Sequence, residues 1–184
     1  MLDLSPNNQK EKIINGSYDR PAGVSILAVL LAIGGGLLLF TQLTALKELN
    51  EASSVLGVSA VLLQGSISLI GLSGVAAAVG MWIGKKWGWW LALFYFAYAV
   101  CRNVNVIISI PGVAEQLGAA VQDQTVNYVK HGIRVVWNSL LMLYLCGEGA
   151  TTYFFGMTSI NKWKAVLIVF AVSILIFAVT TLIA

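Results

Sequence analysis

The chain has 184 residues, of which 58% are hydrophobic and only 10% are charged, and its mean hydropathy is +0.83. A soluble domain carries about 25% charged residues, so this composition excludes a water-soluble globular protein. Intrinsic disorder requires low hydrophobicity and nucleic-acid binding requires a dense basic patch; a net charge of +3 spread along an apolar chain supports neither. The composition predicts a protein that folds in a lipid bilayer.

Five apolar segments meet or approach the roughly 20 residues that a helix needs to cross a bilayer. The predicted spans are 22–44, 57–83, 89–110, 129–146 and 163–184. Because lipid cannot satisfy free backbone polar groups, we expect each span to be helical. The predicted fold is an all-α, polytopic transmembrane helical bundle of five spans, a four-span core with an added C-terminal span. The fourth span opens with Lys130, His131 and Arg134, so a four-span version stays open as an alternative.

Residues 1–21 form a polar tail that lacks the early apolar stretch of a cleaved signal peptide, so we expect the first span to be retained. Lys and Arg residues in short loops predict orientation. One side carries Lys10, Lys12, Arg20, Lys85, Lys86, Lys162 and Lys164, and the other carries Lys47, Lys130 and Arg134. This bias predicts a multi-pass protein of the plasma membrane with a cytoplasmic N-terminus and an outer C-terminus. Five tryptophans near the cytoplasmic span ends are expected to form an aromatic belt there: Trp82, Trp87, Trp89, Trp90 and Trp163.

Small residues recur every four positions in the first two spans, where they let helix backbones approach closely. The candidate packing positions are Ala28, Ala32 and Gly36 in the first span and Ala76, Gly80 and Gly84 in the second. These stripes predict a close contact between spans one and two, or a contact between protomers. The alternative is that they reflect only the general abundance of small residues in membrane helices.

Arg102 is the one basic residue that lies inside a predicted span away from its edges, and it lies on a polar stripe. Tyr98, Cys101, Arg102, Asn105 and Ser109 share one helix face, whereas Asn103 points elsewhere. Gln64, with Ser66 and Ser68, is expected at the same membrane level and could hydrogen-bond Arg102. One interpretation is an outward-opening polar site for an anion, a carboxylate or a lipid headgroup. The other is that Arg102 snorkels to the interface or pairs with Glu115 or Asp123.

The remaining reactive residues predict little chemistry. Cys101 and Cys146 are expected at different depths, too far apart for a disulfide. A single histidine, His131, does not make a metal site, and no cofactor-binding or catalytic motif is present. Glu148 either pairs with Lys85 or Lys86 or is solvated. The loop at 111–128 is expected to contain a short amphipathic helix.

Three short motifs resemble those of a family of small prokaryotic polytopic membrane proteins of unknown function. The segment 20–28 is similar to its "RPxGVxIL" start, 80–93 resembles its "GLWxGKxWAWxLAL" turn, and 153–156 is similar to the end of its last helix. This chain lacks the basic residue and proline that precede the last motif, and it adds a fifth span. The resemblance implies a four-helix membrane core and brings no activity.

Three functions compete at this stage. The leading hypothesis is a non-enzymatic integral membrane protein that is a subunit or assembly partner of a larger membrane complex. Its expected partners are the lipid bilayer and other membrane subunits or further copies of itself, with no cofactor, no metal and no nucleic acid. The alternative is a small homo-oligomeric transporter or channel with an outward-facing polar site formed by Tyr98, Arg102, Asn105 and Gln64. A membrane enzyme acting on lipids or quinones is the third.

Overall fold

The computed structural model describes residues 21–48, 51, 60–117, 124–156 and 161–183. Its elements in chain order are α2 (Ala22–Thr44), α4 (Ala60–Trp82), α5 (Lys86–Leu117), α6 (Gln124–Leu145), the π-helical turn η2 (Gly149–Phe154) and α7 (Lys162–Ile183). No strand occurs in these segments, which confirms the all-α prediction. The polar tail before Pro21, most of the loop at 45–56, and residues 118–123 of the loop at 111–128 lie outside the described residues.

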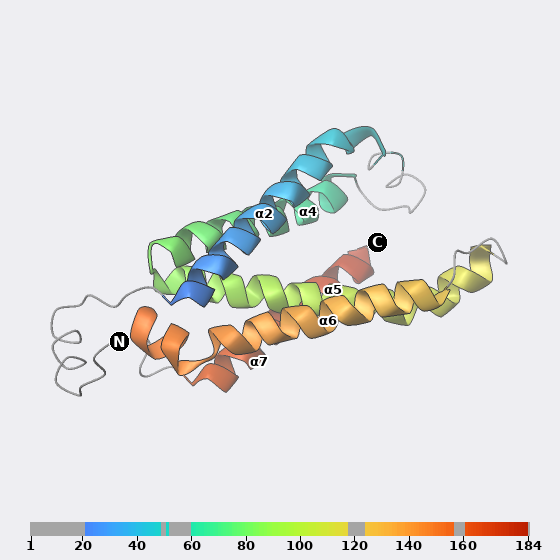
Figure 1. Ribbon diagram of the computed structural model, residues 1–184. Helices are drawn as coiled ribbons and strands as arrows, with labels where there is room; N and C mark the ends of the chain where they lie inside the picture. Colours follow the sequence, from blue (N-terminus) through green and yellow to red (C-terminus); the bar gives the residue numbers. More distant parts are fainter. Residues whose placement is uncertain (1–20, 49–50, 52–59, 118–123, 157–160, 184) are drawn as a thin grey trace, which may run out of the picture.

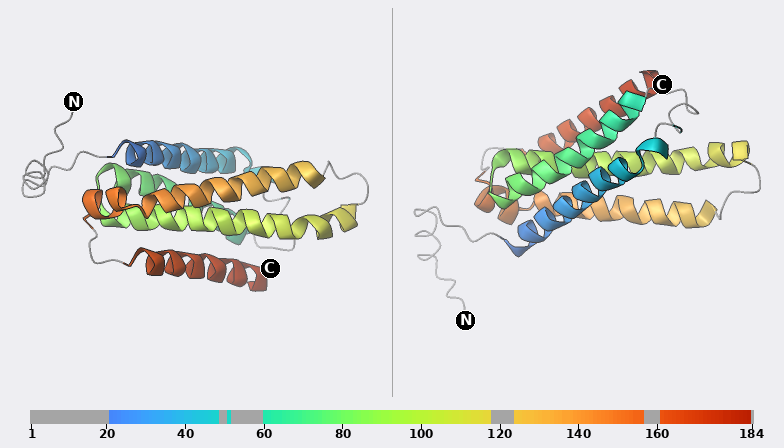
Figure 2. Two further views of the ribbon diagram at one scale, coloured as in Figure 1. Left: turned by 60° about the horizontal axis from the view of Figure 1, so that its bottom comes forward. Right: turned by 90° about the horizontal axis from the view of Figure 1, so that it is seen from above.

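The five long helices alternate in direction, so their ends gather at two ends of the molecule (Figure 1). We name the end that holds the α4–α5 turn at Gly84 the turn end; α2 and α7 also begin there, and α6 finishes there. The opposite end, where α2 and α5 finish, is the open end. α2 packs along α4 and α5 packs along α6. These two arms diverge toward the open end, and α7 lies on the side of α5 away from α2 (Figure 2).

Three helices are long and apolar enough to cross a membrane: Ala22–Thr44, Lys86–Gly112 and Lys162–Val179. In α4 the stretch Ile67–Trp82 is a shorter apolar helix. α6 carries Asn, Lys, His and Arg in its first three turns, which lowers its hydropathy. The structure therefore supports a membrane protein with three candidate spans, and the crossing of the membrane by α4 and α6 stays a prediction.

Large apolar side chains cover the outside of the bundle. Leu43 of α2, Ile108 of α5 and Leu167 of α7 are 69%, 70% and 69% exposed. A soluble protein rarely exposes contiguous apolar patches larger than a few hundred Å². An outer surface of this kind is suited to contact with hydrocarbon.

α4 and α5 are joined by a tight turn at Gly84, which has a φ of 68°. Its N–H bonds to the Met81 carbonyl, and the Lys85 N–H bonds to the Gly80 carbonyl. This pair of bonds satisfies two carbonyls at the end of α4, and the left-handed backbone at Gly84 favours glycine. Gly84 therefore serves the turn rather than a helix-packing stripe, which corrects the sequence interpretation.

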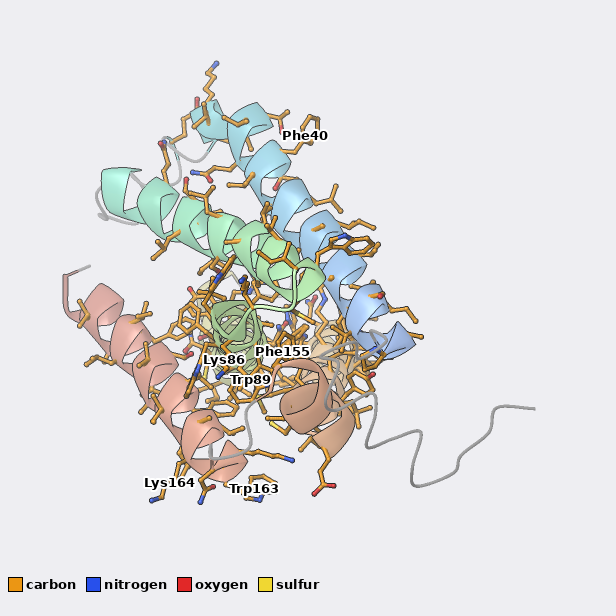
Figure 3. The ribbon with its side chains drawn as sticks, turned by 90° about the vertical axis from the view of Figure 1, so that its left-hand side faces the viewer. Phe40, Lys86, Trp89, Phe155, Trp163 and Lys164 are labelled. Atoms are coloured by element: carbon orange, nitrogen blue, oxygen red, sulfur yellow. The ribbon has the colours of Figure 1, made fainter. Side chains whose placement is uncertain are left out.

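At its other end α5 is longer than predicted, because it continues through Pro111 to Leu117. The helix expected inside the 111–128 loop is in part this extension. The core lies at the turn end, where Trp89 is fully buried near Phe155 (Figure 3). Trp163 projects away from the bundle and is 69% exposed, as an interfacial anchor would be. Trp89 is thus a core residue, and its place in the aromatic belt was wrongly predicted.

Candidate functional site

α2 and α4 cross at three glycines, Gly35, Gly71 and Gly74. A Cβ added to Gly35 would lie 2.6 Å from the Gly71 carbonyl oxygen and 2.8 Å from the Val75 nitrogen. Only hydrogen fits between backbones this close. The Tyr95 ring from α5 fills the next space, since a Cβ on Gly74 would lie 2.9 Å from its Cε2. The glycines therefore allow the backbones of α2 and α4 to touch, and they leave room for the Tyr95 ring of α5.

The contact predicted between the first two spans exists, but it runs through different residues. Ala28 is buried, whereas Ala32 is exposed and a Cβ on Gly36 would meet nothing within 4 Å. The seam uses Gly35, the neighbour of Gly36, because successive residues of a helix point about 100° apart. The α2 stripe of Ala32 and Gly36 thus faces away from α4, which corrects the prediction.

The predicted stripe on α4 also serves another contact. Gly80 packs against Gly88 of α5, where an added Cβ would lie 2.5 Å from the Gly88 Cα. Ala76 is half-buried. Gly80 therefore brings α4 to α5, close to the turn that joins them.

Gln42 joins the α2–α4 arm near the open end. It is 8% exposed; its Nε2 donates to the Gln64 carbonyl oxygen at 2.7 Å, and its Oε1 accepts from the Ser68 hydroxyl at 2.8 Å. Gln64 therefore contributes its backbone to the α2–α4 interface. No hydrogen bond joins Gln64 to Arg102 in the described part of the chain.

The predicted polar stripe on α5 divides into covered and exposed residues. The Tyr98 ring stacks on Phe177 of α7, with centroids 4.9 Å apart and planes 16° apart. Arg102 and Asn105 are exposed, and neither donates a side-chain hydrogen bond to another described residue. The structure therefore does not gather Tyr98, Arg102, Asn105 and Gln64 into one site. Glu115 and Asp123, the proposed carboxylate partners of Arg102, lie outside the residues whose side chains are described.

The buried polar group at this level is Asn103, which the sequence analysis placed away from the stripe. Asn103 is 2% exposed, and its Nδ2 donates to the Ala99 carbonyl at 2.7 Å. Its Oδ1 lies 2.8 Å from Nδ1 of His131 on α6. Because a carbonyl oxygen only accepts, His131 Nδ1 carries the hydrogen and donates. The lone histidine thus links α5 to α6.

A second polar contact joins α5 and α6 at the turn end. The indole Nε1 of Trp89 donates to the Leu145 carbonyl oxygen at 2.8 Å. The Thr151 hydroxyl lies 3.0 Å from the same oxygen and 2.9 Å from the Gly147 carbonyl oxygen, so its one hydrogen is shared between these two acceptors. Trp89 precedes Asn103 by fourteen residues, and Leu145 follows His131 by fourteen. The two contacts are therefore about 21 Å apart along both helices, which keeps α5 and α6 in register over that length.

A pocket of about 190 Å³ lies between α2, α5 and α6. Its lining is Leu30, Leu31, Tyr95, Phe96, Trp137, Asn138 and Leu141. The polar groups among these side chains are the Asn138 amide, the Tyr95 hydroxyl and the indole N–H of Trp137. Trp137 and Leu30 are 56% and 41% exposed, so the pocket opens sideways, toward lipid.

Three cations lie near His131, two helical turns from the pocket residue Asn138 on α6. Lys130 and Arg134 from α6 and Arg102 from α5 all lie within electrostatic range of its ring. Arg102 also acts electrostatically on the hydroxyl of Tyr95, a pocket residue. A cation inside a span costs about 2.5–3.5 kcal/mol at the membrane centre on insertion scales. None of the three pairs with a carboxylate among the residues described.

The other sequence expectations give no chemistry. Cys101 and Cys146 are free, as predicted. Glu148 is exposed and forms no ion pair with Lys85 or Lys86. In the described segments no three His, Cys, Asp or Glu side chains gather into a metal-binding group. No protein-family model matches the chain, and no curated protein and no solved structure is significantly similar to it.

Proposed function

We propose that the chain is a non-enzymatic integral membrane protein that acts as a subunit or assembly partner of a membrane complex. One observation carries the proposal: the buried polar side chains are used for packing. Of the described residues, the buried polar ones are Gln42, Asn103, Thr151 and Ser173. Each hydrogen-bonds to a neighbouring helix or to its own backbone. A catalytic or transport site needs polar groups aimed at a ligand instead.

The outer face of α2 supplies a surface for such assembly. Ala32 is exposed and Gly36 has open space above its backbone, although the neighbouring Gly35 already provides the internal seam. Membrane helices associate through small residues spaced four apart, which allow close approach of backbones. A second copy of the chain or another membrane helix could approach α2 at Ala32 and Gly36.

The test is a pair of bulky substitutions on two faces of α2. Ala32→Leu with Gly36→Leu fills the small-residue face, and Leu37→Phe adds bulk at a position that is 57% exposed on another face. The protein is extracted in a mild detergent, and its mass and copurifying proteins are determined by native mass spectrometry. We expect the double variant to lose its partner or its self-association while remaining folded, and Leu37→Phe to keep both.

A wild-type protein that is monomeric and alone under conditions that preserve other membrane complexes would contradict assembly. Retention of the partner by the Ala32→Leu, Gly36→Leu variant would leave assembly standing but exclude this face. The homo-oligomeric transporter with a site around Arg102 remains the alternative, and the geometry of Tyr98 and Gln64 does not favour it.

A further inference from the structure

The pocket between α2, α5 and α6 has the form of a site for part of a chain-like ligand. Its volume of about 190 Å³ is smaller than the roughly 300–1,000 Å³ of pockets that enclose whole small ligands. Leu31 and Phe96 are buried at 1% and 3% exposure, whereas Leu30 and Trp137 stand at the lipid-facing mouth. Such a crevice can hold a hydrocarbon segment that enters from the side.

Beyond the pocket, toward the open end, the same face of α6 carries basic residues. Lys130, Arg134, Asn138 and Leu141 follow one another at intervals of three or four residues, so they share one side of the helix. Asn138 and Leu141 line the pocket with α2. Arg134 and Lys130 therefore lie above it, toward the open end, one and two helical turns from Asn138. Asn138 Nδ2 donates to the Arg134 backbone carbonyl, and the Arg134 side chain itself is exposed.

Arg102 adds a third positive charge from α5. It follows Tyr95 by seven residues and thus shares its face. Tyr95 lines the pocket and packs against Gly34 and Gly74, so this face of α5 turns toward the α2–α4 arm. Arg102 lies ten residues before Gly112, about 15 Å from the end of the apolar stretch of α5. The cations thus flank the pocket on the side nearer the open end.

We propose that this pocket and its basic rim bind one anionic phospholipid. Its phosphate is held by Arg134 and Lys130 with Arg102 opposite, and one acyl chain lies against Leu31 and Phe96. Guanidinium groups bind phosphate oxygens through charge-assisted hydrogen bonds. The bond from His131 to Asn103 holds the first turns of α6 against α5 and so keeps Lys130 and Arg134 at the rim. The proposal is independent of assembly through Ala32 and Gly36, which lie on another face of α2.

The first experiment compares lipids and charges. The protein is placed in detergent micelles that contain either phosphatidylglycerol or phosphatidylcholine, and lipid retention is counted by native mass spectrometry. We expect wild type to retain one phosphatidylglycerol and the triple variant Arg102→Gln, Lys130→Gln, Arg134→Gln to bind it at least tenfold more weakly. The matched control removes three lysines of the turn end, Lys85, Lys86 and Lys164, and keeps the binding. Equal loss in both triple variants would contradict the site.

The second experiment tests the acyl chain and separates a lipid from free phosphate. Leu30→Trp fills the mouth of the pocket without changing charge, and Leu167→Trp, at a position 69% exposed on α7, is its control. We expect only Leu30→Trp to lose phosphatidylglycerol. Inorganic phosphate or glycerol phosphate at millimolar concentration should not displace the lipid. Displacement by either, or full binding by Leu30→Trp, would overturn the assignment of an acyl chain to the pocket.

Loss of binding must not arise from unfolding. The thermal stability of each variant is therefore measured first without added lipid, where we expect the Gln variant to match wild type, because its three changed side chains are exposed. Phosphatidylglycerol should then raise the melting temperature of wild type and leave that of the triple variant unchanged. An equal rise in both would show that the basic rim takes no part.

Discussion

The two arms of the bundle are held together by different means. The α2–α4 arm closes on glycine, with Gly35 against the backbone of Gly71 and Gly74, and Gln42 is the buried polar residue among its described side chains, near the open end. The α5–α6 arm is joined by large side chains and by hydrogen bonds at two levels, from Trp89 and from His131. Membrane helices lack a hydrophobic driving force between them, so close packing and interhelical hydrogen bonds are the two available means.

The difference predicts where each arm tolerates change. A glycine seam is lost when any side chain is added, whereas its polar contacts are secondary. An arm joined by large residues is lost when they are truncated, and it tolerates added bulk better. Three sets of substitutions separate these two cases.

The largest effect is expected at Trp89, which is fully buried and donates to the Leu145 carbonyl. Trp89→Ala leaves a cavity in the core at the turn end and should cost about 3–5 kcal/mol of unfolding free energy. The measurement is an unfolding titration in mixed detergent micelles. Trp163→Ala, at a residue 69% exposed, is the control and should have little effect. Equal stabilities for the two variants would show that Trp89 does not anchor the core.

An intermediate effect is expected at the glycine seam. Gly35→Ala forces α2 away from the Gly71 carbonyl and should cost about 1–3 kcal/mol, as overpacking does elsewhere. Gly36→Ala, one residue later, meets open space and should be neutral or slightly stabilising, because alanine is the better helix former. The same titration compares the two. A reversed order would place the seam at Gly36, as the sequence stripe suggested.

The smallest effect concerns the hydrogen bond between Asn103 and His131. A double-mutant cycle with Asn103→Leu and His131→Leu should give a coupling energy of about 0.6 kcal/mol, the average for such bonds in membranes. The same cycle with Asn105→Leu in place of Asn103→Leu should give none, since Asn105 is exposed. A coupling of zero in both cycles would mean that the contact does not help to join the arm.

The positions of the helices could be predicted well from the sequence. The first span matches α2 at both ends, and the other four lie within a few residues of their helices except at the ends of α5 and α6. Those two exceptions are physical. Pro111 lies in the last two turns of α5, and residues 124–128 of α6 are mostly polar, so neither stretch has the pattern of a span even though the helix continues.

Which residues of each helix face a neighbouring helix could not be predicted in the same way. Gly34, Gly35 and Gly36 are identical in the sequence, and only the position of α4 decides which of them is covered. Arg102 stands out in the sequence because placing a charged side chain inside a membrane span costs free energy. Asn103 is the residue that the structure buries, because its partner His131 lies on another helix. The pattern of residues in one sequence indicates the period of a helix, but it does not indicate which helix packs against each of its faces.

The shared carbonyl of Leu145 has a consequence for cooperativity. Its oxygen has two lone pairs, and both the Trp89 indole and the Thr151 hydroxyl lie within hydrogen-bond distance of it, from elements on either side of it in the chain. Because these groups meet at one atom, the start of α5, the end of α6 and η2 are structurally coupled there. Changes at Trp89 and Thr151 are therefore expected to be non-additive. We therefore expect the turn end to lose its structure as one unit when either side chain is removed.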